Sequence, residues 1–297
     1  MEKFFNSLKI WIMALRIESL PLSLSAVILG GIIASRQGFF RWEVFICASI
    51  TTLLLHILTN LANDYGDAVS GADSKNLSGP KRMIHSGILS LKQVKNAMII
   101  SALFAFFSGL VLIYVSFEGL KLGAFLFLIL GIFAIGAAIR YTVGRNPYGY
   151  RGLGDIFVFL FFGIVGVAGN YFLHGHDWNW AVLLPASTIG FFVTGVLNIN
   201  NIRDLQPDKE SKKNTLVVKI GRNAALWYHF FLILSGWVCF LIFTAISGEN
   251  KFLPMLTLPL FALNIWTIFT KDNPKKQSAE MGRLALYTIL FVILNAV

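Results

Sequence analysis

Long apolar runs separated by short polar segments dominate this 297-residue chain. Runs of about 17 to 25 apolar residues are long enough to cross a bilayer as helices. The runs lie at residues 19–34, 42–61, 94–115, 120–138, 156–173, 180–197, 224–246, 252–269 and 281–297. The pattern therefore predicts an all-α, polytopic membrane bundle of nine transmembrane helices, with residues 1–297 forming a single membrane-embedded domain.

The two ends of the chain fit this pattern less regularly. The opening stretch MEKFFNSLKIWIMALRIES has basic and apolar residues at helical intervals and no small-residue cleavage site. It predicts an interfacial helix over residues 1–18 that stays on the mature protein. The last run has 17 residues and would reach about 25 Å against a hydrocarbon core of about 30 Å. Hydropathy alone leaves open whether it crosses the membrane completely.

Charge gives the predicted helices an orientation. With nine spans, the N-terminus and the even-numbered loops share one side, and 21 of the 25 lysines and arginines fall there. Basic residues of short loops collect on the cytoplasmic side, so we expect a cytoplasmic N-terminus. The same asymmetry explains the net charge of +10, which in a soluble chain would suggest nucleic-acid binding. We expect no nucleic-acid partner and a multi-pass protein of the inner (cytoplasmic) membrane.

Polar residues gather where the second and sixth apolar runs end. The two long cytoplasmic loops that follow, residues 63–92 and 201–222, hold six of the fifteen acidic residues. At 100° per residue, two sets of four residues each share one helix face: Asn60, Asn63, Asp64 and Asp67 within about 100°, and Asn198, Asn201, Asp204 and Asp208 within about 120°. The sequence thus predicts two matching polar stripes at the cytoplasmic surface.

Such stripes are typical of metal sites that bind phosphate. Carboxylates three or four residues apart on a helix repel each other unless a cation joins them. Hard oxygen ligands suit Mg²⁺, which binds through one or two carboxylates together with phosphate oxygens and water. Two carboxylate pairs on facing helices could hold two Mg²⁺ ions around one diphosphate. The alternative, that Asp and Asn only cap and solvate helix ends, accounts for either stripe alone but poorly for both.

Basic residues near the stripes could neutralise a diphosphate. Lys81 and Arg82 lie in the same loop as the first stripe, in SGPKRMIHSG, and Arg203 and Lys209 interleave with the second. Each of them could equally be a residue that orients the protein in the membrane. A third cytoplasmic segment, IRYTVGRNPYGYRGLGDIF, includes Asp155 at a predicted helix start, where an acid also complements the helix dipole.

The motifs NDYGDAVSGAD and NNIRDLQPD resemble the two aspartate-rich motifs of the UbiA superfamily of intramembrane aromatic prenyltransferases. Together with GPKR, YTVGRNPYGYRGLGDI and NNIRDLQPDKESKKNTLVVKIG, they resemble one branch, which transfers polyprenyl groups to 1,4-dihydroxy-2-naphthoate in menaquinone synthesis. The resemblance covers nearly the whole chain in order and spacing. It implies a UbiA-like bundle around a central cavity that opens to lipid. It also implies Mg²⁺ as cofactor, with polyprenyl diphosphate and dihydroxynaphthoate as substrates.

The resemblance also implies residue roles. One Mg²⁺ would be held by Asn63, Asp64 and Asp67 and a second by Asp204 and Asp208, the four aspartates being the catalytic set. Substrate contacts would come from Asn63, Lys81, Arg82, Arg140, Tyr141 and Asn201. The chain departs from the superfamily pattern at Gly71, where a third acid is usual; the nearest acid is Asp73, to which no ligand role is carried over. The resemblance implies nothing about oligomeric state.

Two other readings stay open at this stage. A sister prenyltransferase could use 4-hydroxybenzoate or another aromatic acceptor, which the acidic motifs do not distinguish. A transporter could also place carboxylates at the membrane edge, but it usually needs polar groups near the midplane. The spans offer few: His56 and Asn170 are expected to be satisfied within the bundle. The HGHD sequence at 174–177 is expected to be a solvated outer loop.

Overall fold

The computed structural model describes residues 2–71, 84, 86–119, 121–248 and 252–296, and all regular structure within these ranges is helical. Its elements are α1 (Glu2–Leu15), η1 (Ile17–Ser19), α2 (Leu20–Arg36), α3 (Trp42–Ser70), α4 (Leu91–Phe117), α5 (Leu122–Arg140), η2 (Tyr148–Arg151), α6 (Gly154–Val158), η3 (Phe159–Gly169), α7 (Asn170–Gly175), η4 (Trp180–Val182), α8 (Leu183–Arg203), α9 (Leu205–Glu210), α10 (Leu216–Ser247), α11 (Phe252–Met255), α12 (Leu258–Thr270) and α13 (Pro274–Leu294).

All nine predicted spans are present among the described residues. Several helices extend beyond the apolar run that revealed them, because polar residues can continue a helix once it leaves the bilayer. The run at 224–246 belongs to α10, which begins at Leu216 and is interrupted at Gly221, a residue with non-helical backbone angles. The last span begins at Pro274 and ends at Leu294, whereas the run was placed at 281–297. Its 21 residues reach about 31 Å at about 1.5 Å each, enough to cross.

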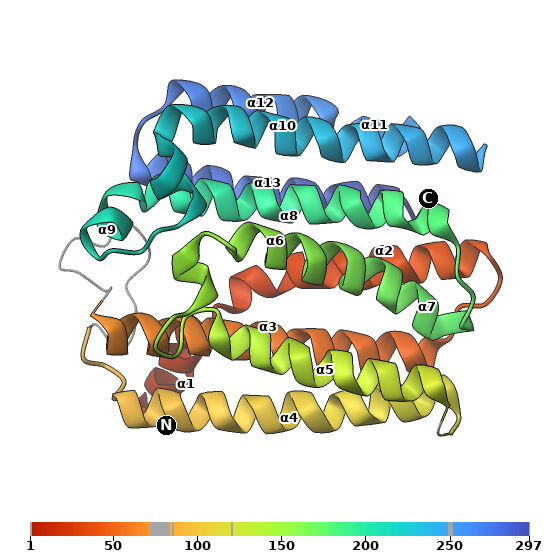
Figure 1. Cartoon of the computed structure of the whole chain (residues 1–297), viewed down its shortest axis with the longest axis horizontal. Helices are drawn as coiled ribbons and strands as arrows, with labels where there is room; N and C mark the ends of the chain where they lie inside the picture. Colours follow the sequence, from red (N-terminus) through yellow and green to blue (C-terminus); the bar gives the residue numbers. More distant parts are fainter. Residues whose placement is uncertain (1, 72–83, 85, 120, 249–251, 297) are drawn as a thin grey trace.

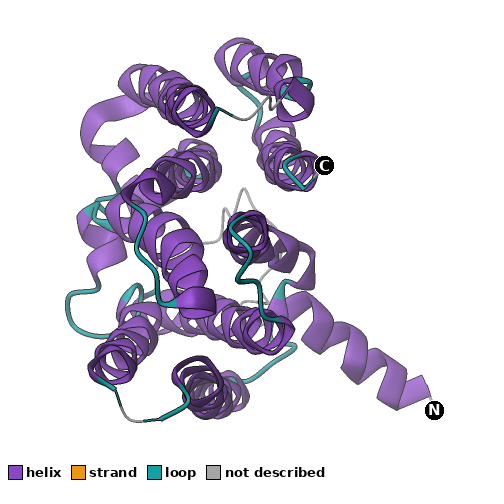
Figure 2. Ribbon diagram, turned by 90° about the vertical axis from the view of Figure 1, so that its right-hand side faces the viewer, coloured by secondary structure: helices purple, strands orange, loops and turns teal. Residues whose placement is uncertain are grey.

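A helix, α1, occupies Glu2–Leu15 of the segment expected to form an interfacial helix, and its place at the membrane interface stays a prediction. Figure 2, in which most of the membrane helices are seen close to end-on, shows α1 projecting away from the bundle. The chain then turns at Arg16, whose φ of 51° lies in the left-handed region, and enters η1 and α2. The residues of this turn reach the polar end of α3, as described below.

The long helices lie side by side along the horizontal direction of Figure 1. In one part of the bundle α3 packs against α2, α4 and α5; in the other, α8 packs against η3, α10 and α13. A close approach joins η3 to α8, where a Cβ on Gly163 would lie 2.6 Å from the Ala186 carbonyl oxygen. Aromatic rings fill the space between α8, α10 and α13, with Phe192 against Trp237 and Phe291.

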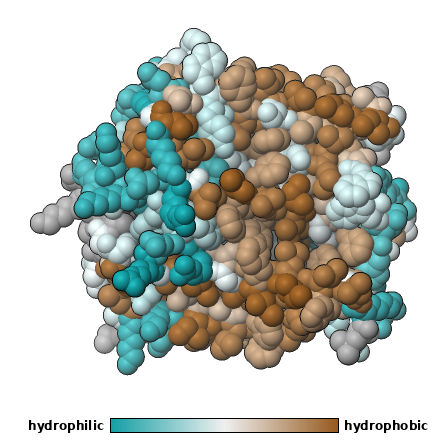
Figure 3. Space-filling model, viewed as in Figure 1, coloured by the Kyte–Doolittle hydropathy of each residue, from teal (hydrophilic) through white to brown (hydrophobic). Residues whose placement is uncertain are grey.

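The surface matches a membrane-embedded bundle. Figure 3 shows an apolar band across the middle of the molecule, with hydrophilic residues gathered at the two ends, most densely at the end that carries α9. Helices α4 and α5 turn large apolar side chains outward, including Phe104, Phe107 and Phe133. Such a continuous apolar surface is stable in contact with lipid and not with water. The protein is an integral, multi-pass membrane protein.

Candidate active site

The first polar stripe lies on one continuous helix, as its spacing predicted. Helix α3 runs for 29 residues from Trp42 and carries its apolar run straight into the acidic motif. Asp64 and Asp67 are almost fully buried, with exposed fractions of 4% and 1%. Asn60, the first residue of the stripe, donates from its side-chain amide to the Leu15 carbonyl at 3.1 Å. Asn60 thus holds the N-terminal segment against α3, and the acids begin one turn later.

A close contact with the loop after α5 sets the position of this motif. The Thr142 hydroxyl donates to the Ala62 carbonyl at 2.8 Å and lies 3.3 Å from the Asn63 side-chain oxygen. Gly66 makes the approach possible, because a Cβ at that residue would lie 2.6 Å from the Thr142 carbonyl group. The loop therefore orients Asn63 while the neighbouring aspartates remain on the adjoining face of the helix.

The second stripe differs from the prediction of one helix face. Helix α8 ends at Arg203, Asp204 has non-helical angles (φ −95°, ψ 11°), and a separate short helix α9 carries Asp208. Pro207 explains the break: proline has no N–H to donate to the Arg203 carbonyl, and its ring crowds that carbonyl. The placement of Asp204 and Asp208 on one uninterrupted helix was therefore wrong.

Asn198, the first residue of this second stripe, is fully buried and donates to the Ala225 carbonyl of α10 at 3.0 Å. It thus has the same structural role as Asn60 in the first stripe. Asn201 is buried near the end of α8. The asparagine that opens each Asn-x-x-Asn pair ties its helix to a neighbouring segment.

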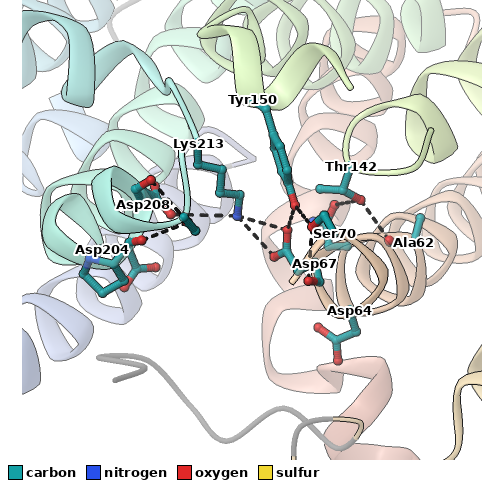
Figure 4. A network of polar contacts seen from close by, with 12 residues as sticks. Ala62, Asp64, Asp67, Ser70, Thr142, Tyr150, Asp204, Asp208 and Lys213 are labelled. Carbon is teal, nitrogen blue, oxygen red and sulfur yellow. Dashed lines mark hydrogen bonds and ion pairs between the residues drawn. The ribbon is translucent and has the colours of Figure 1, made fainter. Parts of the chain in front are cut away.

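The two acidic motifs meet at Lys213. Its ammonium lies 3.1 and 3.2 Å from the two carboxylate oxygens of Asp67 and 3.8 Å from Asp208. Figure 4 shows Asp67 and Asp208 reaching toward this ammonium from opposite sides, with Asp64 projecting from a different part of α3. Tyr150 of η2 completes the group, since its hydroxyl contacts both the Asp67 carboxylate and the Ser70 hydroxyl. Segments from three parts of the sequence thus converge on one polar centre.

The other two aspartates also face cationic groups. The Arg16 guanidinium donates to Asp64 at 2.6 Å, bringing the turn after α1 to the first motif. Arg203 donates two hydrogen bonds, of 2.6 and 2.8 Å, to the Asp204 carboxylate, the bidentate geometry that suits a guanidinium and a carboxylate. Both pairs are partly buried, at the polar end of the bundle.

The donor set of the two motifs fits Mg²⁺ that is shared with a phosphorylated substrate. Among the described residues, no three His, Cys, Asp or Glu side chains lie close enough to hold a metal ion by themselves. Each motif instead supplies one or two carboxylates, the number that Mg²⁺ uses when phosphate oxygens and water complete its shell. These carboxylates already stabilise positive charge, because each of three aspartates lies next to a basic side chain: Asp64 next to Arg16, Asp67 next to Lys213 and Asp204 next to Arg203.

The remaining predicted residues are less closely gathered. Tyr141 follows α5, and burial raises its pKa, as do the charges of Asp155, Tyr148, Asp67 and Asp208, so its hydroxyl remains protonated. Arg140 is exposed, and its guanidinium lies against Gly144. Lys209 is exposed on α9. Three residues considered in the sequence lie outside the described ranges: Asp73, Lys81 and Arg82.

The histidines expected in a solvated outer loop are part of the folded bundle. His174 is 2% exposed, its Nδ1 accepts the Arg41 N–H at 3.0 Å, and its ring stacks on Phe40. His176 contacts the Ser116 hydroxyl at 3.0 Å and stacks on Phe117. His56 was expected to be satisfied within the bundle, and its Nε2 does contact the Ser19 hydroxyl at 2.8 Å.

Sequence reasoning missed Arg16, Tyr150 and Lys213 as members of the site. Each stood in a segment interpreted in another way: Arg16 in the interfacial helix, Tyr150 in the Gly- and Tyr-rich loop, and Lys213 among the topology-determining lysines. A signal existed for Lys213, since it lies only five residues after Asp208 in a sequence of alternating charge. No local pattern indicates Arg16, whose partner is 48 residues away.

Known proteins with similar sequences place this chain in a family. Residues 23–290 match the model of the UbiA prenyltransferase family. The chain belongs to the UbiA prenyltransferase family. It is 40% identical to the 1,4-dihydroxy-2-naphthoate octaprenyltransferase of Haemophilus influenzae, covering 99% of this chain and 96% of that protein. It is also 40% identical to the enzyme of the same name from Escherichia coli, covering 98% of this chain and 96% of that protein.

Solved structures of UbiA homologues share the fold. The apo structure of a homologue from Aeropyrum pernix superposes with a TM-score of 0.72 at 16% identity, covering 94% of this chain and 97% of that one. A homologue from Archaeoglobus fulgidus, solved with DMAPP and Mg²⁺ bound, gives a TM-score of 0.63 at 12% identity and covers 96% and 98% of the two chains. The bundle of nine membrane-spanning helices that the described residues of this UbiA prenyltransferase form is therefore the family fold.

Proposed function

We propose that this UbiA prenyltransferase transfers a polyprenyl group from polyprenyl diphosphate to 1,4-dihydroxy-2-naphthoate, releasing diphosphate and carbon dioxide and giving demethylmenaquinol in menaquinone biosynthesis. Two relatives with 40% identity over nearly the full chain carry the name of that octaprenyltransferase. The observation in the structure that carries the proposal is the convergence of Asp67 and Asp208, from two distant acidic motifs, on one ammonium group.

Two Mg²⁺ ions would be held by Asn63, Asp64 and Asp67 on one side and by Asp204 and Asp208 on the other. When bound, these ions neutralise the charge that grows on the diphosphate as the allylic C–O bond breaks. UbiA homologues from Archaeoglobus fulgidus have been solved with DMAPP or GPP and Mg²⁺, which supports such a pairing of metal and diphosphate.

The chain's own residues orient the diphosphate and the acceptor around this centre. Thr142 holds the Asn63 side chain, and Tyr150 contacts Asp67, so both groups keep the first motif in register. Tyr141 keeps its proton because burial raises its pKa. A protonated phenol next to the polar centre can donate a hydrogen bond to an acceptor oxygen or to a phosphate oxygen, but it does not act as a base.

The bond changes balance without an external oxidant. The diphosphate leaves with the electron pair of the C–O bond. The ring carbon that bears the acceptor's carboxylate supplies the pair for the new C–C bond. Loss of the carboxylate as carbon dioxide then returns an electron pair to the ring and restores the aromatic hydroquinone. An ionised carboxylate makes this sequence complete without a net proton.

The location of the motifs suits a substrate with a charged head and an apolar tail. The acids lie where the apolar part of α3 gives way to its polar end, and the polar end of the bundle carries α9 (Figures 1 and 3). We propose that this end faces the cytoplasm and that the protein lies in the inner (cytoplasmic) membrane, because 21 of the 25 basic residues belong to the predicted cytoplasmic segments.

The purified protein in detergent or nanodiscs, supplied with labelled prenyl diphosphate and Mg²⁺, tests the proposal directly. We expect prenylation of dihydroxynaphthoate with one carbon dioxide released for each product formed, and no product when EDTA replaces Mg²⁺. Turnover of 4-hydroxybenzoate in preference to the naphthoate would assign the protein to another acceptor. Absence of any transfer, with labelled substrate moved across a vesicle membrane instead, would favour a transporter.

A further inference from the structure

Lys213 links the two acidic motifs although it belongs to neither. Its ammonium approaches both oxygens of Asp67, at 3.1 and 3.2 Å, and lies 3.8 Å from Asp208. The two aspartates are 141 positions apart in the chain's numbering, and in Figure 4 the ammonium lies between them. The Lys213 ammonium therefore occupies the place between the two motifs where the proposed function requires positive charge to link them.

The backbone at the end of α9 delivers Lys213 to this place. The Lys213 N–H donates to the Asp208 carbonyl at 2.8 Å, and the Lys212 N–H to the Lys209 carbonyl at 3.3 Å. Lys212 has a φ of 59°, so the segment forms a Schellman motif with a left-handed residue just beyond the helix. This turn reverses the chain and returns Lys213 to the side of the helix that carries Asp208.

Tyr150 forms the other wall of the Lys213 position. The Asn214 N–H donates to the Tyr150 carbonyl at 3.0 Å, which joins the loop after α9 to η2. The Lys213 ammonium lies 4.9 Å from the centre of the Tyr150 ring, within the range of a cation–π contact. The Lys213 side chain is 16% exposed. These contacts hold most of the side chain in place and leave a small part of it accessible.

Electrostatics gives this lysine a role in the metal-free protein. The side chains of Asp67 and Asp208 are 2% and 10% exposed, and buried carboxylates that face each other need a counter-charge. Lys213 supplies that charge. A divalent cation that binds the same carboxylates must therefore compete with the ammonium group.

We propose that Lys213 has two successive partners: the aspartates of both motifs when the site is empty, and the substrate diphosphate when the metal has taken those aspartates. The second role rests on the proposed function, since it requires a diphosphate at this position. A lysine suits both tasks because its ammonium is a compact point charge on a flexible four-carbon stem. The motifs are thus held together before the substrate arrives, and the same charge is available to bind it.

Mg²⁺ binding in the absence of any diphosphate tests the first role. Thermal unfolding of the full-length protein in detergent, followed against Mg²⁺ concentration, reports both the metal-free stability and the concentration of half-maximal stabilisation. For Lys213→Gln we expect a lower unfolding temperature without metal. We also expect half-maximal stabilisation at a Mg²⁺ concentration lower by about fivefold, because the competing ion pair is gone. An unchanged or higher concentration would overturn the first role.

Binding of geranyl S-thiolodiphosphate, an unreactive diphosphate, at saturating Mg²⁺ tests the second role. Loss of a charge-assisted contact predicts that Lys213→Gln binds this probe about tenfold more weakly. Lys213→Gln should thus bind Mg²⁺ more tightly and the diphosphate probe more weakly. This combination is diagnostic, because simple misfolding would weaken both metal and diphosphate binding. Unchanged affinity for the probe would overturn the second role.

Two further variants complete the experiment. Lys213→Arg keeps the charge and should retain the wild-type unfolding temperature without metal. If the glutamine variant folds poorly, this variant still tests whether the charge at residue 213 stabilises the metal-free protein. Lys212→Gln removes the neighbouring, exposed charge and should leave both titrations unchanged. Failure of the wild-type protein to bind the diphosphate probe would refute the proposed function. If the wild type binds the probe and turns over substrate, and Lys213→Gln has the same Mg²⁺ and probe affinities as the wild type, only the role of Lys213 would be refuted.

Discussion

Gly66 of α3 contacts the backbone of Thr142 so closely that a Cβ at residue 66 would lie 2.6 Å from the Thr142 carbonyl carbon and oxygen. The same threonine donates its hydroxyl hydrogen bond to Ala62 at 2.8 Å. The loop after α5 therefore presses on α3 at the turn that separates Asp64 from Asp67. The position of the first acidic motif depends on this glycine as much as on the acids themselves.

Gly66→Ala should displace the motif. The obstacle is backbone and not the end of a flexible side chain, so we expect a loss of stability of about 1 to 3 kcal/mol and a large loss of prenyl transfer. Thermal unfolding and initial rates measure the two effects. Gly136→Ala is the matched control, because nothing lies within 4 Å of a Cβ at that α5 position. A Gly66 variant as stable and active as the Gly136 variant would contradict the contact.

Asp67→Asn and Asp208→Asn should each abolish most of the activity. Each change removes one charged oxygen donor from the proposed metal sites, and we expect kcat/KM to fall by about a hundredfold or more. The Mg²⁺ concentration needed for half-maximal rate should rise in both variants. Asp272→Asn is the control, since Asp272 is exposed and pairs with Arg222 at 3.2 Å on the surface. Full activity in either site variant would refute the assignment of that residue.

Lys212→Gly should stabilise the protein without changing its activity. Lys212 occupies the left-handed position of the Schellman motif, where glycine avoids a steric cost of about 1 to 2 kcal/mol but loses part of that gain to its more flexible unfolded state. We expect a net gain of about 0.5 to 1 kcal/mol, measurable as a rise in the unfolding temperature. A fall in that temperature would show that the positive φ is not strained.

His176 should make the end of the bundle where α7 finishes sensitive to acid. Burial lowers the pKa of His176 from its usual value of 6.5, and Lys121 and Arg41 lower it further while Glu118 opposes them. A lowered pKa means that the unfolded chain binds the proton more readily. The stabilising contribution is therefore complete above about pH 6.5 and is lost as the pH falls through the folded-state value.

Unfolding temperatures measured from pH 7.5 to 5 check this prediction. The wild type should lose stability as the pH falls, and His176→Gln, which can keep a hydrogen bond to Ser116, should lose less. The two curves should converge toward low pH, where the wild-type histidine becomes protonated. Parallel curves for the two proteins would assign the acid sensitivity to other groups.

The sequence by itself determined the helical class, the number of spans found in the described residues and the polar stripe on α3. These features are local: span length follows from the thickness of the bilayer, and the stripe on α3 follows from the angular period of a helix. The helical extent of α3 through Asp67 was predictable for that reason. The break at Asp204 was readable in principle from Pro207, whose missing N–H acts within one turn.

Only the tertiary structure decided which cations meet which carboxylates. Arg16 pairs with Asp64 and Lys213 with Asp67 across separations of 48 and 146 residues. No period or composition specifies such pairs, because they result from the packing of helices around Gly66, the turn at Arg16 and the reversal at Lys212. The sequence placed charge at the membrane surface, and the packing of the bundle brought opposite charges together there, where a counter-charge offsets the cost of burying an ionised carboxylate.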